Sequence, residues 1–272
     1  MNLYDPGTLK TFLGRHGISA AKGLGQHFLV SRSVVDKIVQ SLSGCEGIIE
    51  IGPGPGVLTG PISLQASRMI ALEIDERMIA ALAESAPKAD VRQLDALKSD
   101  LSSLLQELPE PRGVVSNLPY YITGPLLTRI AESRRHYSIA VLMMQKEVGE
   151  RVLAGPKTPA RGSLSVFLQA QFNIERVAVA PAGAFLPPPK VDSIVLSFTP
   201  RLEEFEDEAW FFKVVRVGFT QPRKTLVNNL GGLGCSREQI TTALEQAELG
   251  PLARPQELNL EQWRNLAAKL KR

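Results

Sequence analysis

The sequence predicts an α/β fold: a parallel sheet with helices on both faces, an antiparallel hairpin at one sheet edge, and a small all-helical domain at the carboxyl end. Over the first two-thirds of the 272 residues, short apolar runs alternate with helical periodicity, which is typical of strands joined by crossover helices. After Phe172 the pattern changes to two extended runs joined by a proline-rich loop, which predicts the hairpin. Beyond Pro200 the pattern is helical only. The predicted domains are therefore residues 1–200 and residues 201–272.

Each predicted strand is an apolar run that ends near a glycine or a polar residue. The runs are residues 47–51, 68–74, 89–94, 113–116 and 138–143, and the hairpin strands are residues 174–179 and 191–198. Gly52, Glu73, Asp95 and Asn117 mark four strand ends at intervals of about 22 residues, which leaves room for one helix between neighbouring strands. Because the carboxyl ends of parallel strands share one sheet edge, we expect these four residues to line a ligand site.

The small domain is predicted from four helical patterns that follow an acidic segment at residues 203–208. These patterns are residues 209–220, 223–230, 236–247 and 262–270. Trp210 and Trp263 are expected to anchor its core, and Cys45 and Cys235 are expected to be packing residues.

The composition is that of an ordinary globular protein, with 44% hydrophobic and 22% charged residues. The 31 Lys and Arg against 28 Asp and Glu give a net charge of +3, which permits a nucleic-acid partner without requiring one. The two cysteines form no CxxC pair, so neither a zinc site nor a disulfide framework is indicated. No run of 18 apolar residues and no signal peptide is visible, so we expect a cytoplasmic protein without a membrane partner.

Asn117-Leu118-Pro119-Tyr120 is the most informative motif, because it places an amide, a backbone turn and an aromatic ring at one strand end. The Asn117 side-chain oxygen and the Leu118 carbonyl can accept hydrogen bonds from an exocyclic amino group, and Tyr120 offers a face for stacking. This combination indicates a site for an adenine ring. The same residues are also compatible with an ordinary X-Pro turn in which Tyr120 only fills the core.

A second motif, Glu50 to Gly56, is a glycine-rich loop directly after the first predicted strand. Gly52 and Gly54 let the backbone approach a ligand and leave amides for a carboxylate or phosphate, although the spacing is not that of dinucleotide folds. Glu73 is placed to accept both hydroxyls of a ribose, and Asp95 to accept from an adenine amino group. Taken singly, the loop is also compatible with a plain turn, and the two acids with solvated carboxylates. Together they indicate an adenosyl ligand with an anionic tail.

These motifs, in this order, resemble the small-subunit rRNA adenine N6,N6-dimethyltransferases of bacteria. The matching segments are residues 22–29, 50–59, 73–75, 95–96, 117–120, 145–148, 185–193 and 221–230. The resemblance implies a Rossmann-like class I methyltransferase sheet and S-adenosyl-L-methionine as the methyl donor. It also implies, as product, two adjacent dimethyladenosines in the 3′-terminal hairpin of the small-subunit (16S) rRNA, made during ribosome biogenesis.

By motif position, the resemblance also implies roles for single residues. The implied catalytic loop is Asn117, Leu118, Pro119 and Tyr120, and the cofactor contacts are His27, Leu29, Gly52, Gly54, Glu73, Asp95 and Asn117. Stacking of the target base is expected on Tyr120 or on a nearby ring such as Phe185. Methyl transfer from a sulfonium requires neither a metal nor a nucleophilic side chain, so no metal site is expected.

Two positions depart from the usual pattern of the family. His27 stands where Asn is more common, which keeps a donor for the cofactor carboxylate but lets its charge vary with pH. Pro222 replaces a common Arg and removes one positive charge from a stretch expected to face RNA. A histidine satisfied by the backbone is the alternative interpretation of His27.

The expected RNA contacts are basic residues near the site and in the helical domain. Lys190 follows three prolines on a stiff loop, and Arg223, Lys224 and Asn228 are expected to share one helix face with Arg216 close by. The alternative is a basic helix face that only contacts water. The expected partner is small-subunit rRNA within an immature ribosomal subunit, and a monomer is expected.

Two other functions remain open from the sequence. One is a methylase of large-subunit rRNA of the macrolide-resistance type, which shares the cofactor loop. Leu118 and residues 185–193 favour the small-subunit interpretation. The other is a non-catalytic ribosome-assembly factor, which the intact Gly52, Glu73, Asp95 and Asn117 disfavour.

Overall fold

The computed structural model describes residues 2–18, 27–202 and 207–271, and its contacts divide the chain into two compact units. The first unit consists of Met1–Gly149 with Asn173–Pro200, and the second of Glu150–Phe172 with Arg201–Arg272. The chain passes between the units three times, and the third passage follows residue 200, where the sequence analysis placed its domain boundary. Residues 150–172 group with the second unit, in which α8 (Ser163–Gln171) packs against α9 (Glu208–Gly218).

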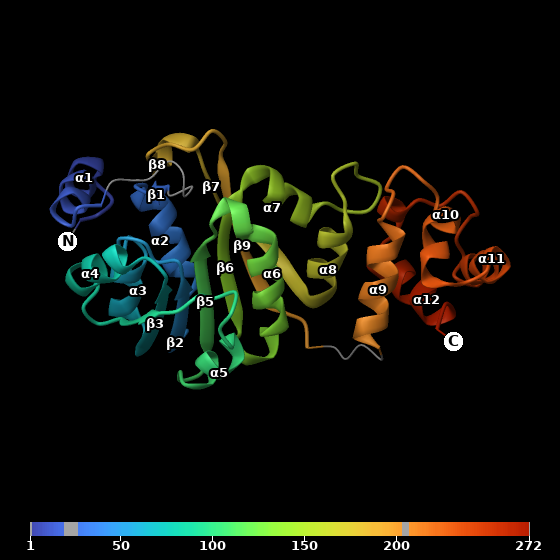
Figure 1. Ribbon diagram of the computed structural model, residues 1–272, viewed down its shortest axis with the longest axis horizontal. Coiled ribbons are helices and arrows are strands. Elements are labelled where there is room, and N and C mark those ends of the chain that lie inside the picture. The colour runs from blue at the N-terminus through green and yellow to red at the C-terminus, as the bar shows by residue number, and fades with distance from the viewer. Residues whose placement is uncertain (1, 19–26, 203–206, 272) are drawn as a thin grey trace. The chain divides into compact units, whose positions relative to one another are not determined.

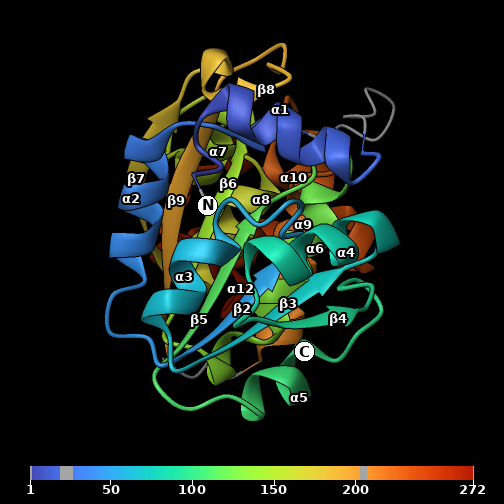
Figure 2. The same cartoon turned by 90° about the vertical axis from the view of Figure 1, so that its left-hand side faces the viewer.

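The first unit is built on a seven-stranded mixed sheet with the order β4-β3-β2-β5-β6-β9-β7. The strands are β2 (Gly47–Ile51), β3 (Arg68–Glu73), β4 (Asp90–Gln93), β5 (Arg112–Asn117), β6 (Ile139–Gln145), β7 (Phe172–Ala180) and β9 (Ser193–Pro200). β2 to β6 pair in parallel, and β9 pairs antiparallel with β6. Figure 2 shows this order from β7 and β9 on the left to β3 and β4 on the right.

The predicted sheet is confirmed strand by strand, with ends that differ by no more than two residues. Every residue of β2 is buried, as expected for a strand with helices on both faces. The α-helices of this unit are α1 (Pro6–Arg15), α2 (Arg32–Ser41), α3 (Thr59–Gln65), α4 (Glu76–Ser85), α5 (Leu101–Gln106) and α6 (Thr123–Glu132) (Figure 1). A further helix, α7 (Lys146–Leu153), begins in this unit and ends in the second. Asp75 and Asp100 cap α4 and α5 by accepting hydrogen bonds from first-turn amides.

Several elements of this unit were not among the sequence predictions, and α2, which precedes the first predicted strand, is one of them. α1 lies near the amino end, in a stretch that the sequence identified only as lacking a signal peptide. A separate two-stranded sheet pairs β1 (Phe28–Leu29) antiparallel with β8 (Phe185–Leu186). This small sheet brings the segment after residue 26 beside the proline-rich loop.

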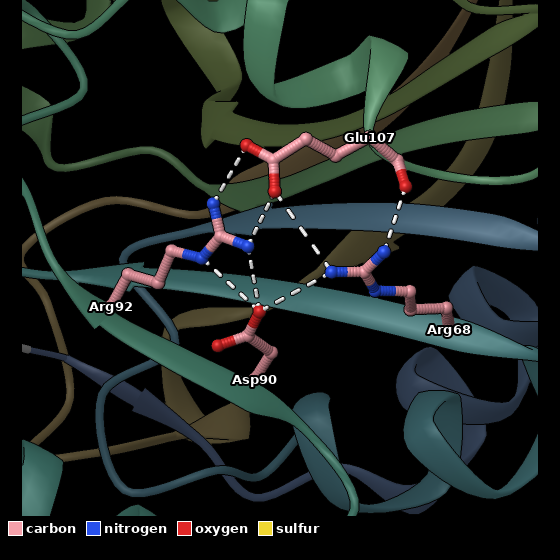
Figure 3. Close-up of polar contacts among 4 residues, drawn as sticks. All are labelled: Arg68, Asp90, Arg92 and Glu107. Carbon is pink, nitrogen blue, oxygen red and sulfur yellow. Dashed lines mark hydrogen bonds and ion pairs between the residues drawn. The ribbon is translucent and has the colours of Figure 1, made fainter.

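An ion-pair network joins the first residue of β3 to the edge strand β4 and to the residue after α5 (Figure 3). Arg92 contacts both Glu107 oxygens, at 2.9 and 2.7 Å, and also Asp90 at 2.7 Å. Arg68 donates to the Glu107 carbonyl at 2.9 Å. The Arg92 hydrogen bonds hold the pKa of Glu107 below its ordinary value. The network therefore ties the sheet edge together at the strand ends opposite the site described below.

The second unit is helical, as predicted. It contains α8 and α9 together with α10 (Leu226–Leu230), α11 (Arg237–Gln246) and α12 (Leu260–Lys269), drawn from orange to red for α9 to α12 in Figure 1. Trp263 is fully buried in its core, and the partly buried Trp210 donates to the Ala267 carbonyl at 2.8 Å, so both predicted anchors belong to this core. The predicted acidic segment lies mostly outside the described residues.

The predicted helix at residues 223–230 is wrong in its first part. Arg223 and Lys224 lie in a turn, and α10 begins only at Leu226. The Asn229 side chain closes this turn, because it accepts from the Gln221 amide and donates to the Gln221 carbonyl, both at 3.1 Å. Arg223 and Lys224 therefore do not share a helix face with Asn228.

Candidate active site

A cavity in the first unit opens at the carboxyl ends of β2, β3 and β5 and just beyond β4. All the residues predicted for the cofactor and for catalysis line it: His27, Leu29, Gly52, Gly54, Glu73, Asp95, Asn117, Leu118, Pro119 and Tyr120. The parallel register explains this convergence, since Ile51 lies opposite both Leu72 and Ser116 in the neighbouring strands. The part of the resembling motif at residues 22–26 lies outside the described residues.

The glycine loop after β2 has a backbone that only glycine adopts readily. Gly52, Gly54 and Gly56 have φ values of 69°, 55° and 93°. A side chain at Gly56 would collide with Ser85 of α4, whereas one at Gly52 would project into open space beside the cavity. The space beside Gly52 is therefore where a ligand can lie against the chain. The prediction that the Gly52 and Gly54 amides are left for a carboxylate or phosphate is wrong, because they donate to the Leu72 carbonyl at 3.0 Å and to the Glu73 carboxylate at 3.1 Å.

Glu73 is held at the end of β3 by three backbone amides. One carboxylate oxygen accepts from Gly54 at 3.1 Å, and the other accepts from Ile74 and Asp75 at 2.8 and 3.0 Å. The oxygen that accepts from Ile74 and Asp75 uses both of its lone-pair directions, whereas the oxygen that accepts from Gly54 retains one, so the fixed carboxylate can also accept from a ligand hydroxyl. The same contact ties the glycine loop to the neighbouring strand.

Asp95 is more exposed and lies just beyond β4. One of its oxygens accepts from the Leu97 amide at 2.9 Å, and the other is 3.6 Å from the Lys98 ammonium. Ile74 and Leu94 also line the cavity, with 62% and 36% of their surface exposed. Exposed apolar side chains between two acids suit the faces of a flat ring.

Glu50 lines the same cavity but was not predicted as a site residue. It is 1% exposed within β2, and its Oε2 atom has no hydrogen-bond partner among the described residues. Burial raises the pKa of Glu50 to about 8, with Glu73 adding to the rise and the Thr59 hydroxyl opposing it. A charged residue inside an apolar strand was a visible signal in the sequence. The buried carboxyl makes the cavity receptive to a positively charged ligand.

The Asn117 to Tyr120 loop leaves the sheet in a defined geometry. The Asn117 Nδ2 atom donates to the His27 carbonyl at 3.1 Å, which fixes the amide orientation and leaves Oδ1 as its acceptor. The Leu118 amide donates to the Met143 carbonyl at 2.9 Å, and after Pro119 the chain forms the 3₁₀ helix Tyr120–Ile122. Tyr120 is half-buried and its ring lines the cavity, so a turn with Tyr120 as core filler does not describe the loop fully.

The aromatic surroundings differ from the prediction in one respect. Phe185 is 3% exposed, pairs in register with Leu29 and does not line the cavity. It is therefore not available for stacking in this structure, because β8 turns its ring into the core. Tyr121, which the sequence analysis did not single out, does line the cavity and is 64% exposed.

The predicted RNA-contacting residues belong to different units. Lys190 is exposed on the proline-rich loop of the first unit, whereas Arg223 and Lys224 are exposed in the turn before α10 of the second. Within the described ranges, no cluster of His, Cys, Asp and Glu is arranged to hold a metal ion. No helix in the same ranges is long and apolar enough to cross a membrane.

Two bacterial relatives match the chain over its full length. It is 40% identical over 286 residues to the "Ribosomal RNA small subunit methyltransferase A" of Streptococcus pneumoniae serotype 2 (strain D39 / NCTC 7466), covering 100% of this chain and 99% of that protein. It is 40% identical over 287 residues to the protein of that name from Macrococcus caseolyticus (strain JCSC5402), covering 100% and 97%.

Solved structures of two methylating enzymes share the fold. A dimethyladenosine transferase from Plasmodium falciparum superposes with a TM-score of 0.71 at 25% identity, covering 88% of this chain and 96% of that one. The 23S rRNA methyltransferase ErmE superposes with a TM-score of 0.68 at 26% identity, covering 89% and 99%. The sequence profile described as "Ribosomal RNA adenine dimethylase" matches residues 18–271. Since this match and the bacterial relatives extend over nearly the whole chain, the protein belongs to the ribosomal RNA adenine dimethylase family.

Proposed function

We propose that the protein transfers methyl groups from S-adenosyl-L-methionine to N6 of two adjacent adenines in the 3′-terminal hairpin of small-subunit rRNA. The observation that carries the proposal is the single cavity that joins the glycine loop and Glu73 to the Asn117 to Tyr120 loop. The full-length relatives named as small-subunit methyltransferases support the choice of RNA.

The residues of the cavity fit the cofactor on structural grounds. The open space beside Gly52 would give the methionine part a place to lie, and the amide-held Glu73 would accept from a ribose hydroxyl. Asp95 would accept from the adenine amino group, while Ile74 and Leu94, which also line the cavity, would cover the ring. The unpartnered oxygen of the buried Glu50 suits a ligand that carries positive charge.

The catalytic contribution of the chain is mainly positioning. When bound, the cofactor supplies an already activated methyl group, so the protein has to hold the acceptor nitrogen in line with it. Such alignment contributes about 7–11 kcal/mol to lowering a barrier. Asn117 Oδ1 is fixed as an acceptor, and together with the Leu118 carbonyl it can hold the two N6 hydrogens. Hydrogen bonding of this kind favours the pyramidal nitrogen that attacks.

The acceptor base has to leave its stack in the RNA before it reaches Asn117. Unstacking costs a few kcal/mol, and stacking on an aromatic ring returns about 1–3 kcal/mol per base. Tyr120 is the ring in the cavity nearest in sequence to Asn117, so we assign the stacking to Tyr120. Lys190, Arg223 and Lys224 are exposed cations that can contact RNA phosphates.

The setting of the reaction follows from its substrate. We propose that the protein acts as a monomer in the bacterial cytoplasm on an immature small subunit. Neither helices that cross a membrane nor metal-binding clusters occur among the described residues.

The proposal is tested by tritiated methyl transfer onto undermethylated small subunits. Asn117→Ala should lose label by about 10²-fold or more, because it removes the fixed acceptor, while RNA affinity stays within about twofold. The matched control is Asn173→Ala, an exposed asparagine of β7, which should label as wild type does. Equal labelling by wild type and Asn117→Ala would refute the assigned role.

A large-subunit substrate is the alternative that the similarity to ErmE supports. Primer-extension mapping of dimethyladenine in both rRNAs separates the two substrates. Stops in the 3′-terminal hairpin of the small-subunit RNA support the proposal. Stops confined to the large-subunit RNA would replace it.

A further inference from the structure

Tyr120 is fixed from two sides by residues of two other segments of the first unit. Its hydroxyl is 2.8 Å from the Ser193 hydroxyl, and its ring lies against the His27 ring with centroids 5.7 Å apart and planes inclined by 28°. Both neighbours lie within the described residues and come from segments far from Tyr120 in sequence. An aromatic side chain held at its tip and on one face has little freedom to change rotamer.

Ser193 is a rigid anchor because the sheet holds it. It is the first residue of β9, it is fully buried, and it lies opposite Gln145 at the end of β6. Burial also raises the pKa of Tyr120, so its phenol keeps its proton for the contact with Ser193. The position of the Tyr120 hydroxyl is therefore set by the central sheet.

His27 is anchored in turn by the small sheet. The antiparallel pairing places Phe28 opposite Leu186, which leaves His27 beside Pro187. His27 Nδ1 lies 2.8 Å from the Pro187 carbonyl, and because a carbonyl only accepts, Nδ1 carries a hydrogen. The imidazole is thereby fixed in one orientation against Tyr120.

The backbone of His27 reaches the other functional side chain of the loop. Its carbonyl accepts the 3.1 Å hydrogen bond from Asn117 that leaves the Asn117 oxygen as acceptor. One residue therefore contacts both Asn117 and Tyr120, which are the two side chains assigned to the target base. The ring makes one contact and the main chain makes the other, so a substitution removes only the first.

We infer that His27 is a positioning residue for the acceptor side of the reaction, acting through Tyr120, with Ser193 as its partner at the other end of the phenol. The inference rests on the proposed function and deepens it, because the sequence analysis treated His27 either as a cofactor contact or as a histidine satisfied by the backbone, and neither interpretation includes the contact with Tyr120. The ring fixes the face on which the adenine stacks, and this face sets how the N6 nitrogen meets the methyl group.

The test separates an acceptor-side role from a cofactor-side role. We compare wild type with His27→Ala, His27→Phe and Ser193→Ala, using His136→Ala and Ser138→Ala as matched controls outside the cavity. For each variant we measure the Kd of S-adenosyl-L-methionine by calorimetry and the single-turnover rate on undermethylated small subunits with both reactants saturating.

An acceptor-side role predicts a loss of rate without a loss of cofactor binding. His27→Ala should slow the single turnover by about threefold to tenfold and leave the cofactor Kd within about twofold. His27→Phe restores a ring face and should recover most of the rate, and Ser193→Ala should slow it in the same sense. The opposite result, a Kd raised tenfold with a full rate at saturation and no rescue by phenylalanine, would make His27 a cofactor ligand only and overturn the inference.

A measurement without turnover keeps this inference distinct from the proposed function. In protein with carbon-13 labelled tyrosine, the Tyr120 ring signals, assigned with Tyr120→Phe, should shift and broaden in His27→Ala and return toward wild type in His27→Phe. Unchanged Tyr120 signals in His27→Ala would refute the positioning of Tyr120 by His27, even if methyl transfer is normal. If the wild-type protein methylates neither rRNA while the variants still show these shifts, the proposed function is refuted, but the positioning of Tyr120 by His27 is supported.

Discussion

Replacement of Glu50 by glutamine should make the protein more stable, and increasingly so as the pH rises. Burial raises the pKa of Glu50 to about 8 in the folded protein, from an ordinary value of 4.5. Each unit of difference between folded and unfolded pKa corresponds to about 1.4 kcal/mol, so the full effect is about 5 kcal/mol. Glutamine has nearly the same shape and does not titrate, so it removes this pH dependence.

The sign follows from which state holds the proton. Between pH 4.5 and about 8 the unfolded chain has an ionised Glu50, while the folded protein keeps it protonated. The unfolded state then binds fewer protons. The contribution that protonated Glu50 makes to the free energy of unfolding is therefore complete below pH 4.5 and is lost progressively as the pH rises from 4.5 through 8. The advantage of Glu50→Gln over wild type should therefore grow by about 2 kcal/mol between pH 6 and pH 8.

The assay is urea unfolding of wild type and Glu50→Gln at pH 6, 7 and 8 without cofactor, followed by circular dichroism. Glu175→Gln, an exposed glutamate of β7, is the matched control and should show no such growth. When the variants are compared at each pH, the contributions of the other titrating groups to the free energy of unfolding cancel, because these groups are present in all three proteins. A constant difference between Glu50→Gln and wild type across this range would show that Glu50 is already ionised in the fold, and the reasoning would fail.

Three further outcomes can be measured on single substitutions. Arg223→Gln and Lys224→Gln should each lower the slope of log K against log salt for RNA binding by about 0.7 to 0.9, and an unchanged slope would move the RNA surface elsewhere. Gly56→Ala should destabilise the fold by about 1–3 kcal/mol in chemical unfolding, because of its φ of 93° and the contact with Ser85, whereas Gly155→Ala has open space and should cost less. Glu107→Gln should lower the thermal midpoint at pH 7, because the lowered pKa of Glu107 means that its carboxylate stabilises the fold above its ordinary pKa and loses this effect as the pH falls. That difference should shrink in 1 M salt, and a difference that persists there would contradict an electrostatic origin.

The sheet was predictable because most of its strands are short apolar runs whose character does not depend on distant contacts. The residues at the strand ends were predictable for the same reason, since parallel pairing brings Gly52, Glu73 and Asn117 to one edge whatever helices lie between. The even spacing of these residues along the chain therefore indicated that they lie together in the fold. The glycine loop was readable because a positive φ requires glycine.

The elements that were missed depend on partners remote in sequence. β1 and β8 have two residues each and exist only because they pair with one another across the unit. The turn at residues 221–225 has helix-compatible residues, and the side chain of Asn229 closes it together with the backbone hydrogen bond from Lys224 to Gln221. The sequence predicted that the Phe185 ring lies beside the site, but the pairing of β8 with Leu29 buries this ring. In each case local propensity was overridden by a contact that the sequence does not display.

The structure gives a physical reason why the two reactants can be aligned without a flexible arm. In the proposed assignment, the cofactor side is held by the hydrogen bond from Gly54 to Glu73, and the acceptor side by the hydrogen bond from Asn117 to the His27 carbonyl. Glu73 and Asn117 end strands that pair with β2, so both sets of contacts are fastened to one rigid sheet. A shift of about 1 Å between reacting atoms is enough to cost orders of magnitude in rate. Fastening both sides to the same strand therefore gives positional accuracy that separate loops would not give.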